Sequence, residues 1–154
     1  MGRIYKVTFE NVTTSAAQDL VAAYGASGKM CKLRRVWAEC YTATPTSQNL
    51  GYRVRFLPAT VTPGTGGGAA TPQKTDQGDA SATFTARIND TSKATTTGTA
   101  SIFEEGAAHI LAGYDKSFEA PLTFGASTAV VFELLSTPSG SVALSGGVEV
   151  EEIG

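Results

Sequence analysis

His109 is the only histidine of the chain, so any mechanism that needs an imidazole base has to use it. It stands between Ala108 and Ile110, in a segment that we expect to form a strand. The sequence holds no Gly-x-Ser-x-Gly turn that would present a serine nucleophile to it. One histidine and two cysteines also lack the spacing of zinc ligands. We therefore expect no catalytic residue and no metal or cofactor site.

Carboxylates occur in pairs at three places, and such a pair can hold a cation or perform acid–base chemistry. Glu104-Glu105 and the pair Asp76 and Asp79 lie in turn-like sequence, where acidic side chains commonly serve solubility. Glu149 and Glu151 alternate on one face of the last predicted strand, which favours a solvated or subunit-facing edge over a catalytic dyad. We expect the chain not to be an enzyme and to have no small-molecule substrate.

Cys31 and Cys40 bracket a run without Gly, Pro, Asn or Asp, so both should lie on one long strand over residues 30–42. Their odd separation then places them on opposite faces and about 30 Å apart. A disulfide needs Cα atoms within roughly 7 Å. Two free, half-buried thiols are therefore predicted.

Apolar and polar residues alternate in the first and the last segment of the chain. Tyr5, Val7 and Phe9 share one face of the first segment, and Val148 and Val150 share one face of the last. A repeat of two residues indicates a β-sheet with one face buried and the other exposed to solvent. The segment 16–24 also scores as a helix because of its alanines, but the Gly25–Gly28 turn that follows favours a strand.

The sequence predicts one all-β domain over residues 1–154, a jelly-roll or Greek-key β-sandwich of about eight antiparallel strands. The run 128–135 is almost continuously apolar, so it should be a central strand covered on both faces. Short strands are expected on either side of Glu104-Glu105-Gly106. The other expected strands cover residues 5–10, 19–24, 30–42, 51–57, 82–88, 117–124 and 142–151.

A Gly-, Pro- and Thr-rich loop is predicted at about 58–79, and it includes Pro63 and Gly66. The glycine run 66–68 is not a phosphate loop, because no Gly-Lys-Ser/Thr follows it. Loops of this length are usually functional or disordered. We expect this one to be mobile in the free protein and to become ordered against a neighbouring subunit or another partner.

The formal net charge of −2 gives no strong field toward nucleic acid or a membrane, and neither is expected as a partner. No apolar run approaches the roughly 20 residues of a membrane helix. Met1-Gly2-Arg3 leads into a strand without an apolar leader, so we expect synthesis in a cytoplasm. Arg53 and Arg55 lie on the non-core phase of their strand, as solvated or interface residues.

The beginning of the chain (residues 2–20, GRIYKVTFENVTTSAAQDL) and its end (residues 145–154, SGGVEVEEIG) resemble a family of small proteins encoded near the head genes of tailed phages and prophages. Similar proteins are capsid decoration, or cement, proteins. The resemblance implies a virion structural protein, made in the host cytoplasm and bound to the outer surface of the head. Its partners would be the major capsid protein and two further copies of itself in a homotrimer.

Within such a trimer, we expect Arg53 and Arg55 to face Glu149 and Glu151 of a neighbour, because their charges are opposite. Two other classes stay open. A head-fibre or tail-tip module that recognises a receptor or glycan shares the sandwich, although the loops here carry almost no aromatic residues. A jelly-roll enzyme such as a cupin needs several metal-binding histidines, which one histidine cannot supply.

Overall fold

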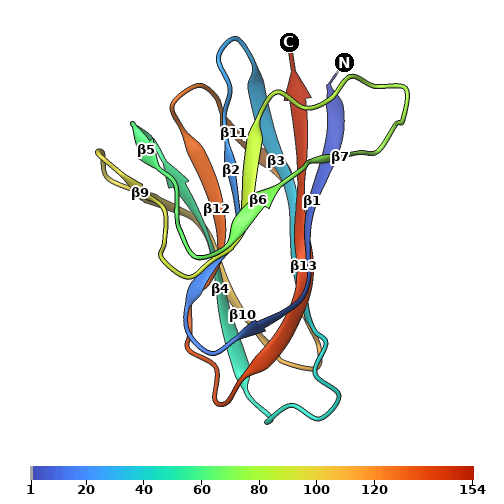
Figure 1. The fold of residues 1–154 in the computed structure, drawn as a ribbon, viewed down its shortest axis with the longest axis vertical. Helices are drawn as coiled ribbons and strands as arrows, with labels where there is room; N and C mark the ends of the chain where they lie inside the picture. The colour runs from blue at the N-terminus through green and yellow to red at the C-terminus, as the bar shows by residue number, and fades with distance from the viewer. Residues whose placement is uncertain (1) are drawn as a thin grey trace.

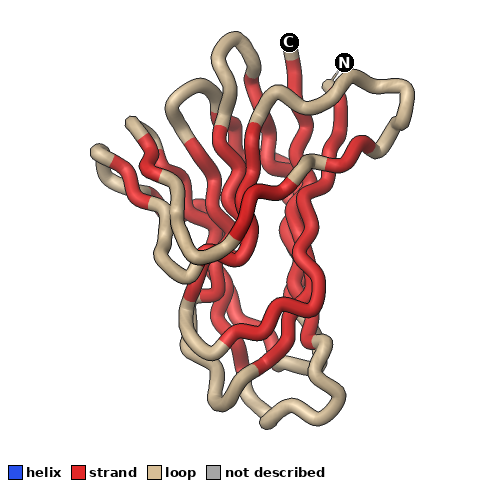
Figure 2. The backbone as a smooth tube through the Cα atoms, viewed as in Figure 1, coloured by secondary structure: helices blue, strands red, loops and turns tan. Residues whose placement is uncertain are grey.

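The computed structural model describes residues 2–154, and all regular structure in that range is strand, with no helix (Figure 2). Two antiparallel sheets face each other, in the strand orders β11-β3-β13-β1-β7 and β10-β4-β12-β2-β8-β6, and β5 pairs with β9 separately. The predicted all-β sandwich is confirmed. The strands are β1 (Arg3–Thr14), β2 (Gln18–Tyr24), β3 (Met30–Cys40), β4 (Asn49–Leu57), β5 (Val61–Thr62), β6 (Gly68–Ala70), β7 (Gln73–Lys74), β8 (Thr85–Asp90), β9 (Thr95–Thr96), β10 (Ser101–His109), β11 (Tyr114–Phe124), β12 (Ala129–Leu134) and β13 (Val142–Ile153).

Eight of these strands pair in nested order. The first, β1, pairs with the last, β13, and moving inward from both ends β2 pairs with β12, β3 with β11 and β4 with β10. The ladders β13–β3 and β12–β4 join these pairs into the two sheets. Figure 1 shows β1 and β13 side by side, with the two chain ends together at one end of the sandwich. Each pair of partner strands thus encloses the next pair along the chain.

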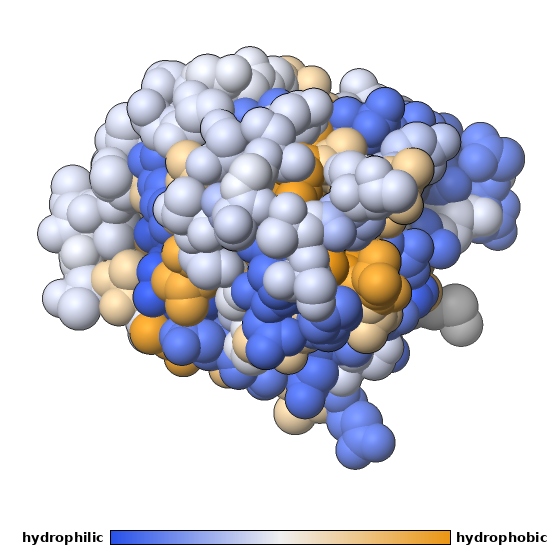
Figure 3. All heavy atoms as spheres, turned by 90° about the horizontal axis from the view of Figure 1, so that it is seen from below, coloured by the Kyte–Doolittle hydropathy of each residue, from blue (hydrophilic) through white to orange (hydrophobic). Residues whose placement is uncertain are grey.

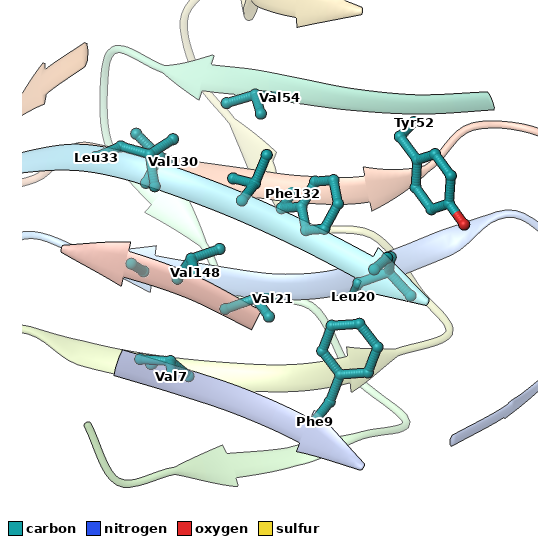
Figure 4. Packing of buried hydrophobic residues seen from close by; sticks show 14 of the residues in the cluster. Val7, Phe9, Leu20, Val21, Leu33, Tyr52, Val54, Val130, Phe132 and Val148 are labelled. Carbon is teal, nitrogen blue, oxygen red and sulfur yellow. The ribbon is translucent and has the colours of Figure 1, made fainter. Parts of the chain in front are cut away.

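The main core lies between the inner faces of the two sheets. Figure 4 shows Phe9 and Leu33 of the five-stranded sheet pointing toward the same interior as Val54 and Phe132 of the six-stranded sheet. All four are at most 1% exposed. Along β1 and β4, buried residues alternate with less buried ones because the pleat turns successive side chains to opposite faces.

A bulge in β3 changes the predicted placement of the cysteines. Pairing with β13 shifts register between Arg35 and Leu33, so the face of the strand switches at Arg34. Cys31 is buried, and Cys40 packs against the same core, so the expected placement on opposite faces is wrong. Both thiols are free, as predicted. The length of strand between them keeps them apart.

One strand replaces the two short strands expected around Glu104-Glu105-Gly106. β10 runs through this acidic segment because β4 supplies a continuous hydrogen-bonding partner, and a register shift after Ile102 accommodates it. The residues that follow form the turn into β11, which begins at Tyr114 and not at Ser117. The segment with helical propensity, by contrast, forms β2 as predicted.

Residues 58–100, which we call the insertion, separate the fourth nested strand, β4, from the fifth, β10. Within the insertion, β8 and β6 extend the six-stranded sheet beyond β2, and β7 extends the five-stranded sheet beyond β1. The chain thus crosses from one sheet to the other between β6 and β7 and closes that side of the sandwich. β5 and β9 form an arm that projects sideways (Figure 1).

The glycines of the insertion provide close packing. A Cβ on Gly67 would lie 2.1 Å from the carbonyl oxygen of Ile88, and one on Gly64 would lie 2.5 Å from that of Ser92. Thr65 and Ser92 exchange two backbone hydrogen bonds of 3.0 Å. The segment 58–79 thus contains the short strands β5, β6 and β7 where a continuous loop was expected, and its mobility in the free protein stays a prediction.

Candidate functional site: the outer face of the six-stranded sheet

The insertion covers part of the outer face of the six-stranded sheet. Ala22 of β2, Leu57 of β4 and Val131 of β12 point away from the main core, yet each is at most 1% exposed. Ala94 and Val61 of the insertion pack on them and form a second, smaller core. All six residues of β12 are buried, so the predicted coverage on both faces is confirmed.

A buried ionic cluster continues this face beyond the apolar part. Its centre is Glu133 of β12, whose side chain is fully buried. Arg53 Nε donates to Glu133 Oε1, and Glu133 Oε2 lies 3.1 Å from Arg55 Nε and 2.9 Å from Lys93 Nζ. Three cations thus surround one carboxylate, because a buried charge is tolerated only when paired.

Asp19 of β2 is the second carboxylate of the cluster. Its Oδ1 accepts a hydrogen bond from Arg55 Nη2 (3.1 Å), and its Oδ2 accepts one from the backbone N–H of Ala94 (2.8 Å). Burial raises the pKa of Asp19, and this effect outweighs the lowering by the Ala94 and Arg55 bonds. Through Lys93 and Ala94, the cluster fastens the insertion to the centre of the sheet.

Glu152 of β13 anchors the insertion at a second point. Its Oε2 accepts hydrogen bonds from the backbone N–H and hydroxyl of Thr83 (2.8 and 2.6 Å) and from Phe84 N–H (3.2 Å). The side chain is almost fully buried. Burial, with a smaller contribution from the Glu152 charge, raises the pKa of Cys31 to about 12. Cys31 is therefore held as a neutral thiol.

A cavity of about 380 Å³ lies between the arm and the ends of β2 and β8. Tyr24, Thr85 and Arg87 line it from the sheet, and Val61 and Pro63 line it from the insertion. Burial raises the pKa of Tyr24 to about 12. Pro63 is the one residue of the sequence-predicted contact set that borders this cavity.

The predicted contact residues lie on different sheets of one chain. Arg53 and Arg55 bind the buried carboxylates of the ionic cluster, whereas Glu149 and Glu151 belong to β13 of the five-stranded sheet. Glu151 pairs with Arg34 on its own sheet (2.6 Å). The two arginines are thus engaged within their own chain, and their pairing with glutamates of a neighbouring subunit stays a prediction.

Gly66, the other loop residue singled out from the sequence, has a φ of +94° and packs against Thr91. Of the predicted acidic pairs, Glu104 lies 3.7 Å from Lys116, and Asp79 lies 3.6 Å from Arg3. No group of three or more His, Cys, Asp or Glu residues within 2–154 is arranged to hold a metal ion. No helix in that range is long and apolar enough to cross a membrane.

His109 contacts Ser47, and the orientation of its ring decides what this contact can do. The backbone N–H of Leu111 donates to His109 Nδ1 (3.3 Å), which places the proton of the neutral imidazole on Nε2. Nε2 therefore donates to Ser47 Oγ at 3.0 Å. In this arrangement the ring donates to the serine hydroxyl and does not accept its proton.

Reasoning from the sequence missed the ionic cluster, although it left a signal. Glu133 interrupts the continuous apolar run of β12, and Asp19 precedes the apolar run of β2. A charge inside a strand that must be buried on both faces requires a partner of opposite sign. Arg53 and Arg55 were the available partners on the neighbouring strand.

Comparisons of the chain with known proteins found no match: no family model, no curated protein and no solved structure is similar to it.

Proposed function

We propose that this protein is a structural component of a phage virion, a decoration protein that binds the outer surface of the head. The observation that carries the proposal is the nested pairing of eight strands, first with last, in an all-β sandwich. The second ground is the resemblance of residues 2–20 and 145–154 to phage head proteins. These segments correspond to β1, the start of β2 and most of β13. A fold alone does not specify a function, so direct binding tests are needed.

The open side of the sandwich is the surface that fits a second copy. The side bordered by β6 and β7 is closed by the chain itself, whereas β10 and β11 are both unpaired on their outer edges. Phe103 and Phe118 meet edge to face between the sheets on the open side (ring centroids 5.0 Å apart). A bulge and Pro121 protect the edge of β11, as natural edge strands require.

Two exposed apolar side chains lie on β10 and in the turn that follows it. Ile102 on β10 is 57% exposed, and Leu111 in the turn after it is 71% exposed. An unpaired strand with exposed apolar side chains is suited to contact another copy of the same chain. We propose that this side forms the homotrimer contact.

The end of the sandwich seen in Figure 3 carries apolar atoms in separate patches surrounded by polar atoms. Scattered patches of this kind favour a modest contact per subunit. A trimer that engages a capsid lattice at several points would gain affinity from multivalency without a large single interface. The major capsid protein is assigned as the second partner on the resemblance to phage head proteins.

Co-sedimentation tests the proposal. Heads assembled from the major capsid protein of the phage or prophage proposed to encode this chain are pelleted with the purified protein over a range of concentrations. The proposal expects saturable pelleting that is weakened when Leu111→Asp or Ile102→Asp reduces the trimer to monomers. A protein that remains in the supernatant with both unexpanded and expanded heads is not a decoration protein of that lattice.

A further inference from the structure

The outer face of β10 carries side chains in a nearly palindromic order. Every second position of its ladder with β4 points away from the main core, because the positions between them lie opposite buried core residues of β4. The outward positions hold, in chain order, Ile102, Glu105, Ala107 and His109. The extra residue of the bulge is Phe103, so a single ladder position separates Ile102 from Glu105.

Leu111 extends this order beyond the end of the strand. The N–H of Ile110 donates to the carbonyl of Gln48 (2.9 Å), which continues the contact with the segment that leads into β4. Ile110 is 3% exposed and belongs to the main core, so Leu111 is the next residue that points outward. The edge therefore reads apolar, acidic, small, basic, apolar. Its two ends, Ile102 at 57% and Leu111 at 71% exposed, leave apolar surface in water.

This order matches itself when two copies of β10 meet edge to edge. The outer edge of β10 is unpaired, and an antiparallel pair of identical strands is related by a twofold axis, so that each contact occurs twice. With the axis at Ala107, Ile102 of each copy lies opposite Leu111 of the other, and Glu105 lies opposite His109. The residues next to the axis are glycine and alanine, so no bulky side chain obstructs the approach of the two backbones.

Charge and apolar contact favour this register over its neighbours. An axis at Glu105 would set two glutamates directly opposite each other, which destabilises a strand pair. An axis at His109 would set two imidazoles opposite each other and separate Ile102 from Leu111. Of these three registers, the one centred on Ala107 brings acid to base and joins the exposed apolar side chains across the contact.

We propose that two copies of the free protein pair through β10 in the register centred on Ala107, and that this dimer makes the β10 edge unavailable to the homotrimer contact. The dimer gives partners to backbone N–H and C=O groups of β10 that have none in the single copy. Its effect on the trimer rests on the proposed function, because both contacts use the same edge and a copy enters one of them at a time. Assembly on the head then requires the dimer to dissociate.

Sedimentation equilibrium of the parent protein over a range of concentrations tests the dimer. We expect a dimer as the main associated species of the free protein. A parent that remains a monomer, or that associates only as a trimer, overturns the proposal, and the trimer result leaves the proposed homotrimer contact standing. Pelleting with heads tests the capsid partner separately.

Single cysteines under mild oxidation test the register. Opposed residues of an antiparallel pair have Cα atoms about 4.5–5.5 Å apart, within reach of a disulfide. Ala107→Cys lies on the axis and should link two copies. Glu105→Cys is the matched control, because the two copies of residue 105 would lie roughly 14 Å apart in this register, and the parent controls for Cys31 and Cys40. Equal linkage of the two variants, or none by Ala107→Cys, overturns the proposal.

An exchange of charges tests the contact between Glu105 and His109. Glu105→Lys should raise the dissociation constant of the dimer about tenfold, because both acid–base contacts are lost. Adding His109→Glu to this variant should restore the parent value, since it returns opposite charges to both contacts. A double variant that dimerises as weakly as Glu105→Lys alone means that the two residues do not meet, and the proposed register is then wrong.

Discussion

Lys93 Nζ lies 2.9 Å from Oε2 of Glu133, and this contact joins the insertion to the most buried strand of the protein. Glu133 also binds Arg53 and Arg55 of β4. The carboxylate thus connects β4, β12 and the insertion at one point. Because two arginines and a lysine all contact the Glu133 carboxylate, removing its charge leaves these cations without their shared counter-ion.

Glu133→Gln is expected to lower the free energy of unfolding by about 3–5 kcal/mol, the usual cost of removing one partner of a buried ionic network. Urea unfolding followed by circular dichroism measures this cost. Glu119→Gln, at an exposed position of β11, is the control and should change stability by less than about 0.5 kcal/mol. Equal effects of the two substitutions would show that the cluster does not stabilise the fold.

The glycines of the insertion should differ in their tolerance of a methyl group. Gly67→Ala should destabilise the protein by about 1–3 kcal/mol, because its Cβ would collide with the backbone of Ile88. Gly68→Ala is the matched control, since a Cβ there meets nothing within 4 Å. Thermal melts of both variants check this. A Gly67→Ala protein as stable as Gly68→Ala would return the segment to the status of a flexible loop.

The two cysteines should react at different rates. Burial raises the pKa of Cys31 to about 12, so almost no thiolate forms at pH 8, whereas Cys40 is only partly buried. Iodoacetamide should therefore modify Cys40 first in the folded protein and reach Cys31 only after denaturation. Peptide mass spectrometry over time measures both. Modification of Cys31 at the rate of an unfolded thiol would place it outside the core.

Acid stability should depend on Asp19. Its pKa is raised above the ordinary value of 3.8, so the folded state holds this proton more tightly than the unfolded state. The resulting stability is present below pH 3.8 and is lost as pH rises through the folded pKa. The difference in unfolding free energy between the parent and Asp19→Asn should therefore shift in favour of the parent as pH falls.

Asp115 has the opposite effect on the pH dependence of stability. This effect is the same in the parent and in Asp19→Asn, so it cancels in the difference between their unfolding free energies. Its hydrogen bond with Arg35 lowers the pKa of Asp115, and the stability this gives is lost as pH falls below 3.8. Urea midpoints from pH 3 to 7 for both proteins measure the difference. Parallel profiles for the parent and Asp19→Asn would contradict the raised pKa.

The strands that could be predicted are those with a clear apolar pattern in their own residues. The alternation of Tyr5, Val7 and Phe9 and the apolar run of β12 are set by which faces are buried, and both appear as expected. The bulge at Arg34 was not predictable, because neither Gly nor Pro marks it. It arises from the pairing of β3 with β13, which lies at the far end of the chain.

Distant contacts also explain what local sequence did not reveal about the insertion and about Arg53. Gly64 and Gly67 indicated flexibility because their close neighbours, residues 88–92, cannot be identified from local sequence. Arg53 was correctly placed on the non-core face of its strand, but the carboxylate that binds it, Glu133, belongs to another strand of the sheet. The sequence pattern predicts on which face of the sheet a side chain lies, whereas the pairing of strands distant in the sequence determines which residues cover that side chain.

The most direct measurement of the central claim is a cryo-electron microscopy map of heads incubated with the purified protein. The proposal predicts added density on the outer surface at symmetry-related lattice positions. Each density should fit three sandwiches, with β10 of one copy facing its neighbour. Bare heads at saturating protein, or density for isolated single sandwiches, would contradict the assignment of this chain as a trimeric decoration protein.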